Sequence, residues 1–116
     1  MKTKVIIIIA LVLCCSCTNK TAIENGELQE AISQVWLDAD AAQGMLGGID
    51  TNDLSEYEMQ RYRLTEAHLM LKRELRQPAE INLDAMAKYF VSCGDEAAAS
   101  EAYYIQGAYL NYIGEN

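Results

Sequence analysis

Apolar positions recur at helical spacing through most of the chain, and no segment alternates between apolar and polar residues as a half-buried strand does. The first apolar stripe consists of Leu28, Ile32, Val35, Trp36, Ala39, Ala42, Met45 and Leu46. Asn25 can cap a helix before this stripe, and Thr21 has capping-box spacing to a glutamate. Asp38 and Asp40 can divide the stripe into two helices, and the composition of segment 47–53 predicts a loop.

A longer helix is predicted from Ser55, which has capping-box spacing to Glu58, to about Arg76. Placed at about 100° per residue, its apolar side chains fall on two opposite sides. One side holds Tyr57, Leu64, Ala67, Leu71 and Leu75, and the other holds Met59, Tyr62, Leu69 and Met70. Because a helix that is apolar on two sides packs on two sides, we expect it in the middle of a stack. Pro78 follows its end.

Two more helices are predicted after this proline. Asn82 can cap the first, and Gly94 can end it in the left-handed conformation. The apolar face of that helix is Leu83, Met86, Ala87, Phe90 and Val91. Asp95 and Glu96 form an acidic first turn of the last helix, whose stripe is Ala99, Ala102, Tyr103, Tyr109, Leu110 and Ile113. Gly107 costs about 1 kcal/mol relative to Ala inside a helix, which indicates a close approach of another helix.

The first twenty residues follow a different pattern. Lys2 and Lys4 precede an unbroken apolar run from Val5 to Cys15. Because a membrane-spanning helix needs about 20 apolar residues, this run is too short for a stable span. Its length is typical of the apolar region of a secretory signal peptide. An uncleaved signal anchor is the alternative interpretation.

The small residue Ser16 stands directly before Cys17 at the end of the run, and this arrangement resembles the box of bacterial lipoproteins. The resemblance implies cleavage after Ser16 and a lipid on the sulfur of Cys17. Two or more acyl chains hold a protein durably on a membrane, whereas one chain binds it marginally. The expected division is a signal peptide over 1–16, a polar tether over 17–22 and a helical domain over 23–116.

The lipoprotein resemblance also predicts a location. Thr18 follows Cys17 in place of the aspartate that retains many Gram-negative lipoproteins in the inner membrane. We therefore expect a lipid-anchored protein of the cell envelope, at the outer membrane and facing the periplasm. Cys14 and Cys17 have CxxC spacing, but the pair straddles the cleavage site. Cys93 then has no partner, so no intramolecular disulfide is expected.

A second resemblance lies in the last predicted helix. Tyr103, Gly107 and Gly114 stand at the spacing of the first helix of a tetratricopeptide repeat, from which Gln106 and Leu110 depart. Segment 83–95 is similar to the second helix of a preceding repeat. The resemblance covers about residues 28–115. It implies an all-α fold of antiparallel helical hairpins, stacked as a short tetratricopeptide-like solenoid of about five helices after the signal peptide.

Stacked repeats bury their faces against neighbouring repeats. Because the sequence ends after the first helix of a repeat, we expect that helix to be partly uncovered. Its candidate protein-binding face consists of Tyr103, Gly107, Tyr109, Leu110 and Ile113. The implied function is a lipid-anchored scaffold that binds a protein or peptide, without catalysis. The alternative is a non-functional or regulatory N-terminal remnant of a longer repeat-containing sensor or regulator.

The composition of the chain argues against some classes of binding partner. The chain has 116 residues, with 9 basic and 17 acidic side chains and a formal net charge of −8. This acidic balance argues against a nucleic-acid-binding surface, because phosphates require a basic face. At 51% hydrophobic residues the chain is not disordered by composition.

Metal and cofactor motifs are absent from the sequence. The segments that start at Asp38 and Asp50 begin like calcium loops, but they lack the central glycine and the closing glutamate. The single histidine also argues against a multi-histidine metal site. We therefore expect neither a metal nor a cofactor.

The single histidine, His68, is expected at the boundary between an apolar face and the polar stripe of Thr65 and Lys72. A pair of His68 with Cys93 is conceivable. However, Cys93 ends a helix, where the helix dipole disfavours a thiolate. An enzyme or a carrier of small ligands would gain support only from a buried polar cluster around His68.

Overall fold

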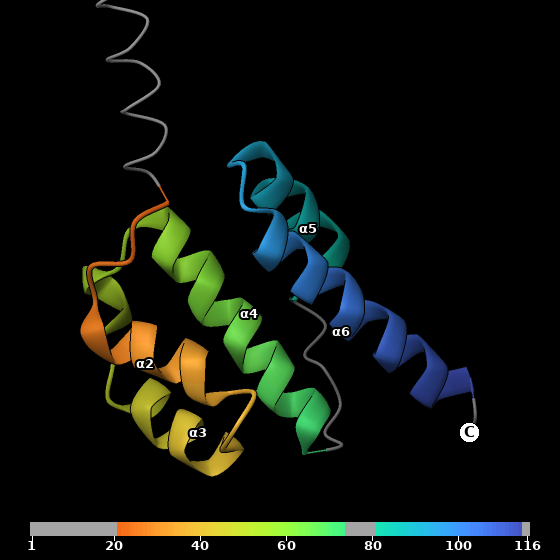
Figure 1. Ribbon diagram of the computed structural model, residues 1–116, viewed down its shortest axis with the longest axis horizontal. Coiled ribbons are helices and arrows are strands. Elements are labelled where there is room, and N and C mark those ends of the chain that lie inside the picture. Colours follow the sequence, from red (N-terminus) through yellow and green to blue (C-terminus); the bar gives the residue numbers. More distant parts are fainter. Residues whose placement is uncertain (1–20, 74–80, 115–116) are drawn as a thin grey trace, which may run out of the picture.

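The computed structural model describes residues 21–73 and 81–114, with side chains as far as Leu110. Five α-helices and one short 3-10 turn make up this part of the chain, which contains no strand (Figure 1). The elements are α2 (Gly26–Gln34), α3 (Ala39–Gly47), η1 (Thr51–Asp53), α4 (Glu56–Lys72), α5 (Leu83–Ser92) and α6 (Glu96–Gly114). The all-α expectation is therefore confirmed, and the helices pack in pairs.

Side-chain caps begin all five α-helices. Asn25 accepts a hydrogen bond from the backbone N–H of Leu28, so Asn25 rather than Thr21 caps α2. Asp38 caps α3 and divides the first apolar stripe into two helices, as predicted. Asn82 caps α5 in the same way. Each cap satisfies a backbone donor that has no partner inside its own helix.

The helix α4 lies in the middle of the fold, between the pair α2–α3 and the pair α5–α6 (Figure 1). Leu64 and Ala67 belong to a core cluster with α5 and α6, whereas Leu69 belongs to a second cluster with α2 and α3. The prediction of a helix packed on two sides is therefore confirmed. Met59 and Met70, predicted on the second side, are only half-buried and belong to neither cluster.

The helix α4 ends earlier than the sequence pattern predicted. Its last residue is Lys72, and Arg73 is the C-cap. The predicted end near Arg76, together with Leu75 and Pro78, lies outside the described residues.

One carboxylate joins the starts of α2 and α4. Ser55 and Glu58 form the predicted capping box. Beyond this box, Oε2 of Glu58 accepts hydrogen bonds from the backbone N–H groups of Glu24 and Asn25, at 3.1 and 2.9 Å. Burial raises the pKa of Glu58, but the hydrogen bonds from Ser55, Asn25 and Glu24 outweigh it and lower that pKa below its usual value.

Three predictions near the ends of α3 and α5 meet different outcomes. Gly47 belongs to α3, and the predicted loop that follows it contains the 3-10 turn η1. Gly94 has a φ of +80°, so the left-handed end of α5 is confirmed. Val91 is exposed, so its placement on the apolar face of α5 was wrong.

The apolar stripe predicted for α6 was wrong in part. The buried side chains of its first half are Ala98, Ala99, Ala102 and Ile105. Tyr103 and Leu110 are exposed instead. A Cβ added at Gly107 would meet nothing within 4 Å, so none of the described helices approaches closely there. Tyr103 lies on the uncovered face of the first half. At Gly107 and Leu110 the reason is length: α6 has 19 residues against 10 in α5, and its second half extends beyond the hairpin (Figure 1).

Candidate functional site

The structure spreads the sequence-predicted binding residues around α6. Viewed along the axis of α6, where successive residues are about 100° apart, Tyr103 and Leu110 point in directions within about 20° of each other. They are 47% and 61% exposed. Tyr109 lies about 120° from Tyr103, on the side of the buried Ile105, and it is half-buried. Gly107 is exposed. The side chain of Ile113 and the predicted lipid site at Cys17 lie outside the described residues.

A different cluster forms where α2, α4 and α6 meet. Trp36 follows α2, His68 comes from α4, and Glu101 and Tyr104 come from α6. The ring of Trp36 meets the ring of His68 edge to face, with centroids 4.3 Å apart. The ring of Tyr104 lies 5.9 Å from that of Trp36 and 6.2 Å from that of His68. We call these four residues the aromatic–carboxylate site.

The histidine of this site is buried, which corrects the expected boundary position. His68 is 1% exposed, because Trp36 and Tyr104 lie against it. Its Nδ1 lies 3.1 Å from Oε2 of Glu101. A carboxylate oxygen accepts, so Nδ1 carries the proton and donates this hydrogen bond. The buried polar pair that would support a ligand or catalytic site is therefore present.

Two properties limit what the His68 pair can do chemically. The pair joins His68 to Glu101, and no contact with Cys93 is seen within the described residues. A general base needs a nucleophile or acid within hydrogen-bonding distance, and the rings of Trp36 and Tyr104 occupy the space beside the imidazole. These two rings remain about half exposed, at 51% and 55%, so the accessible part of the site is aromatic.

Sequence analysis missed this site because its members come from three segments. Glu101 and Tyr104 are three residues apart on α6, and their shared face lies beside the alanine-rich buried stripe. That spacing was the only local signal. The contact of His68 with Glu101 spans 33 positions, and no sequence pattern specifies it.

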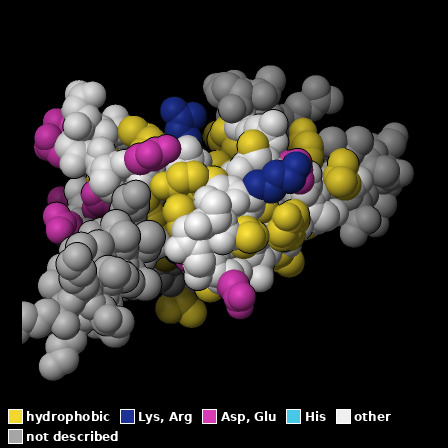
Figure 2. Space-filling model, turned by 90° about the horizontal axis from the view of Figure 1, so that it is seen from above, with side chains coloured by type: hydrophobic (Ala, Val, Ile, Leu, Met, Phe, Trp, Pro, Cys, Tyr) yellow, Lys and Arg dark blue, Asp and Glu magenta, His cyan; other side chains and the backbone are white. Residues whose placement is uncertain are grey.

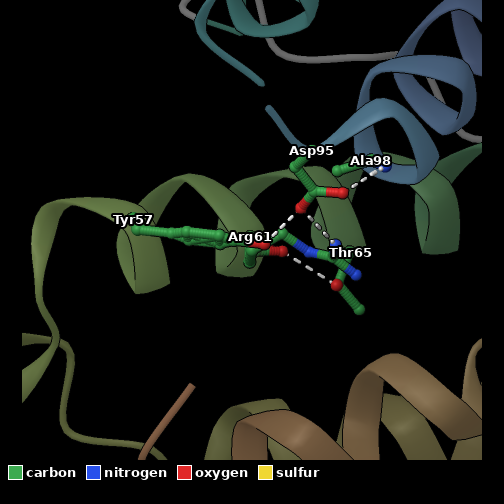
Figure 3. A network of polar contacts seen from close by, with 5 residues as sticks. All are labelled: Tyr57, Arg61, Thr65, Asp95 and Ala98. Atoms are coloured by element: carbon green, nitrogen blue, oxygen red, sulfur yellow. Dashed lines mark hydrogen bonds and ion pairs between the residues drawn. The ribbon is translucent and has the colours of Figure 1, made fainter. Parts of the chain in front are cut away.

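A second polar network joins α4 to the start of α6 (Figure 3). Oδ2 of Asp95 accepts hydrogen bonds from the hydroxyl of Tyr57 and from Nη1 of Arg61, the latter at 3.3 Å. Oδ1 of the same carboxylate accepts from the backbone N–H of Ala98 and so caps α6. The network therefore holds one helix end against the middle helix.

The network shifts two pKa values in opposite directions. Burial and the hydrogen bond to Asp95 raise the pKa of Tyr57 to about 12. Burial raises the pKa of Asp95, but the hydrogen bonds from Tyr57 and Ala98 and the charge of Arg61 lower it below its usual value. Both shifts favour the state in which a neutral tyrosine donates to an ionised aspartate.

The side of α4 that lies opposite His68 carries a row of three shallow hollows. Their volumes are about 250, 240 and 330 Å³. Adjacent hollows share lining residues, so they form one groove between α3 and α5. Met59, Tyr62 and Met70 supply its apolar surface, and Arg63 and Glu66 supply opposite charges.

Figure 2 shows hydrophobic side chains in the middle of one face, with acidic side chains at several points around them.

Asp38 and Asp50, which begin the calcium-like segments, serve as N-caps of α3 and η1. Among the described residues, no three histidine, cysteine, aspartate or glutamate side chains are placed to hold a metal ion. In residues 21–73 and 81–114, no helix has both the length and the apolar character that a membrane span requires.

No protein-family model, no curated protein and no solved structure matches this chain.

Proposed function

We propose that this protein is a lipid-anchored helical-repeat scaffold that binds another protein in the cell envelope and catalyses no reaction. The observation that carries the proposal is the pair of half-exposed rings, Trp36 and Tyr104, at the meeting point of three helices. Large aromatic side chains are enriched at protein interfaces, where their burial contributes much of the binding energy.

The order of helix contacts supports the repeat part of the proposal. The helix α4 contacts both α2 and α3 on one side and chiefly α6 on the other. Helical pairs that contact only their neighbours along the chain are what a stack of helical repeats requires. The contact between α4 and α5 is the weakest of those around α4. Further repeats would pack against the second half of α6.

The His68–Glu101 pair is the observation that favours the rival function, an enzyme or a carrier of small ligands. We prefer a structural role for this pair because the imidazole is 1% exposed and is covered by two aromatic rings. A substrate would have to displace Trp36 to reach it.

The lipid anchor is tested by metabolic labelling with palmitate. Cys17→Ala should abolish incorporation and release the protein from the membrane fraction. Cys14→Ala and Cys15→Ala are the matched controls and should keep the label, because Ser16 precedes only Cys17. Retained labelling of Cys17→Ala would disprove the lipid site.

Protein contact is tested by photo-crosslinking in cells. A benzophenone amino acid in place of Tyr104 should give a crosslink to a second protein. The same substitution at Leu110 tests the face predicted from the sequence, and at the exposed Lys88 of α5 it serves as the control. Crosslinks of equal yield from positions 104 and 88, or none from positions 104 and 110, would contradict the proposal.

A further inference from the structure

We infer that the aromatic–carboxylate site binds an arginine-bearing segment of a protein partner. The inference rests on the proposed function, since it specifies the chemistry of the partner at that surface. Three observations lead to it: the two exposed rings, the state of the carboxylate beside them, and the charge of the chain.

The rings offer a surface on which a planar cation can stack. Trp36 lies in the turn after α2 and Tyr104 lies on α6, their ring centroids are 5.9 Å apart, and their planes are tilted by 37°. Such close rings form a continuous shelf rather than a slot between them. A guanidinium group stacks on aromatic faces and is more weakly hydrated than an ammonium group, so arginine suits this shelf better than lysine.

Glu101, three residues before Tyr104 on α6, supplies a carboxylate that is hydrogen-bonded to His68, and both rings of this shelf contact the same histidine. The side chain of Glu101 is 9% exposed, and His68 holds Oε2 through the 3.1 Å hydrogen bond. Among the described residues, Oε1 of Glu101 has no hydrogen-bond partner. A fixed, largely desolvated carboxylate with one oxygen available binds a guanidinium more strongly than a mobile surface carboxylate does.

Charge over the whole chain favours the same partner. The formal net charge of −8 attracts cationic segments and repels acidic ones. The nearest opposing charge by helix position is Lys72, one turn after His68 on α4 and exposed. Removal of this charge by Lys72→Gln should therefore strengthen binding of a cation rather than weaken it.

The fluorescence of Trp36 reports the site directly, because the chain contains a single tryptophan. The full-length chain in neutral detergent is titrated with acetylated and amidated tetra-arginine at constant salt. We expect a saturable fluorescence change. Tetra-citrulline has nearly the same shape without the charge, and we expect it to bind about tenfold more weakly.

Variants locate the binding. Glu101→Gln keeps a hydrogen-bonding group beside His68 but removes the charge, and we expect about tenfold weaker binding of tetra-arginine. Tyr104→Leu should weaken it about threefold. Two controls should change it less than about twofold: Glu96→Gln, which removes an exposed charge from the same helix, and Tyr103→Leu, which removes a ring from another face. Circular dichroism confirms that each variant is folded.

If tetra-citrulline binds as tightly as tetra-arginine, the inference is wrong. The inference is also wrong if Glu101→Gln and Glu96→Gln weaken the binding of tetra-arginine equally, since binding would then follow net charge alone. These failures are separable from failure of the proposed function. A crosslink from position 104 without binding of tetra-arginine would disprove only the arginine-bearing partner. The absence of crosslinks would contradict the scaffold itself.

Discussion

Single polar side chains, rather than apolar contacts alone, join the helices of this protein. Glu58 joins α4 to the start of α2, Asp95 joins α6 to α4, and Glu101 joins α6 to His68. Each carboxylate accepts hydrogen bonds from a group on another element. Loss of such a partner leaves a buried donor unsatisfied, which costs more than the bond itself contributes.

We expect Glu58→Gln to destabilise the fold by about 1–2 kcal/mol at pH 7, because an amide replaces an acceptor of three backbone N–H groups. The pKa of Glu58 is lowered in the folded state, so its contribution is present above the ordinary value of 4.5 and is lost as the pH falls through the folded value. Urea unfolding from pH 7 to pH 3 measures this.

The control for that experiment is Glu56→Gln, an exposed acid in the first turn of the same helix. It should change stability by less than about 0.5 kcal/mol. If the difference between wild type and Glu58→Gln stays constant down to pH 3, the assigned pKa shift is wrong.

Tyr57→Phe should destabilise the fold by about 1 kcal/mol at pH 8, since it removes one hydrogen bond and keeps the ring beside Phe90. The pKa of Tyr57 is raised to about 12 in the folded state. Its contribution is therefore present below pH 10 and is lost as the pH rises toward 12. The difference in unfolding free energy between wild type and Tyr57→Phe should therefore be smaller at pH 11 than at pH 8. A difference that grows with pH would contradict the assigned pKa shift.

At the scale of elements, the features that the sequence predicted well are local. The caps Ser55 and Asn82, the division of the first stripe at Asp38 and the left-handed Gly94 were predicted because each depends on the few residues around it. The two-sided packing of α4 was predicted because helical periodicity records which sides are covered.

The face of α6 was harder to predict because its buried side chains are mostly small. Ala98, Ala99 and Ala102 give a weak apolar signal, whereas the exposed Tyr103 and Leu110 give a strong one. Burial of His68 depends on the approach of Trp36 and Tyr104 from other elements. Periodicity along one helix contains no information about such contacts.

Gly107 allows a test of α6 as an element. Because nothing lies within 4 Å of a Cβ added there, Gly107→Ala should stabilise the fold by about 1 kcal/mol through helix propensity. Gly94→Ala is the contrasting variant, and it should destabilise the fold by at least about 1 kcal/mol, because φ at this position is +80°. Thermal unfolding compares the two. A destabilising Gly107→Ala would mean that another helix packs against that face.

At the scale of the whole molecule, one long helix holds two hairpins on its opposite sides, and each hairpin contributes its own core cluster. Neither hairpin has another described helix to cover its inner face, so both depend on α4. We therefore expect the described helices to unfold as one cooperative unit. The rings of Trp36 and Tyr104 lie on the surface that the packing of these helices leaves exposed to solvent.

The central claim is that these helices close their own core and leave that aromatic surface to another protein. The most direct test is the mass in solution of residues 18–116, made without lipid, together with thermal unfolding followed by far-ultraviolet circular dichroism. The account predicts a helical monomer with a single cooperative transition. A stable dimer that buries Trp36, or a helical chain that melts without cooperativity, would contradict it.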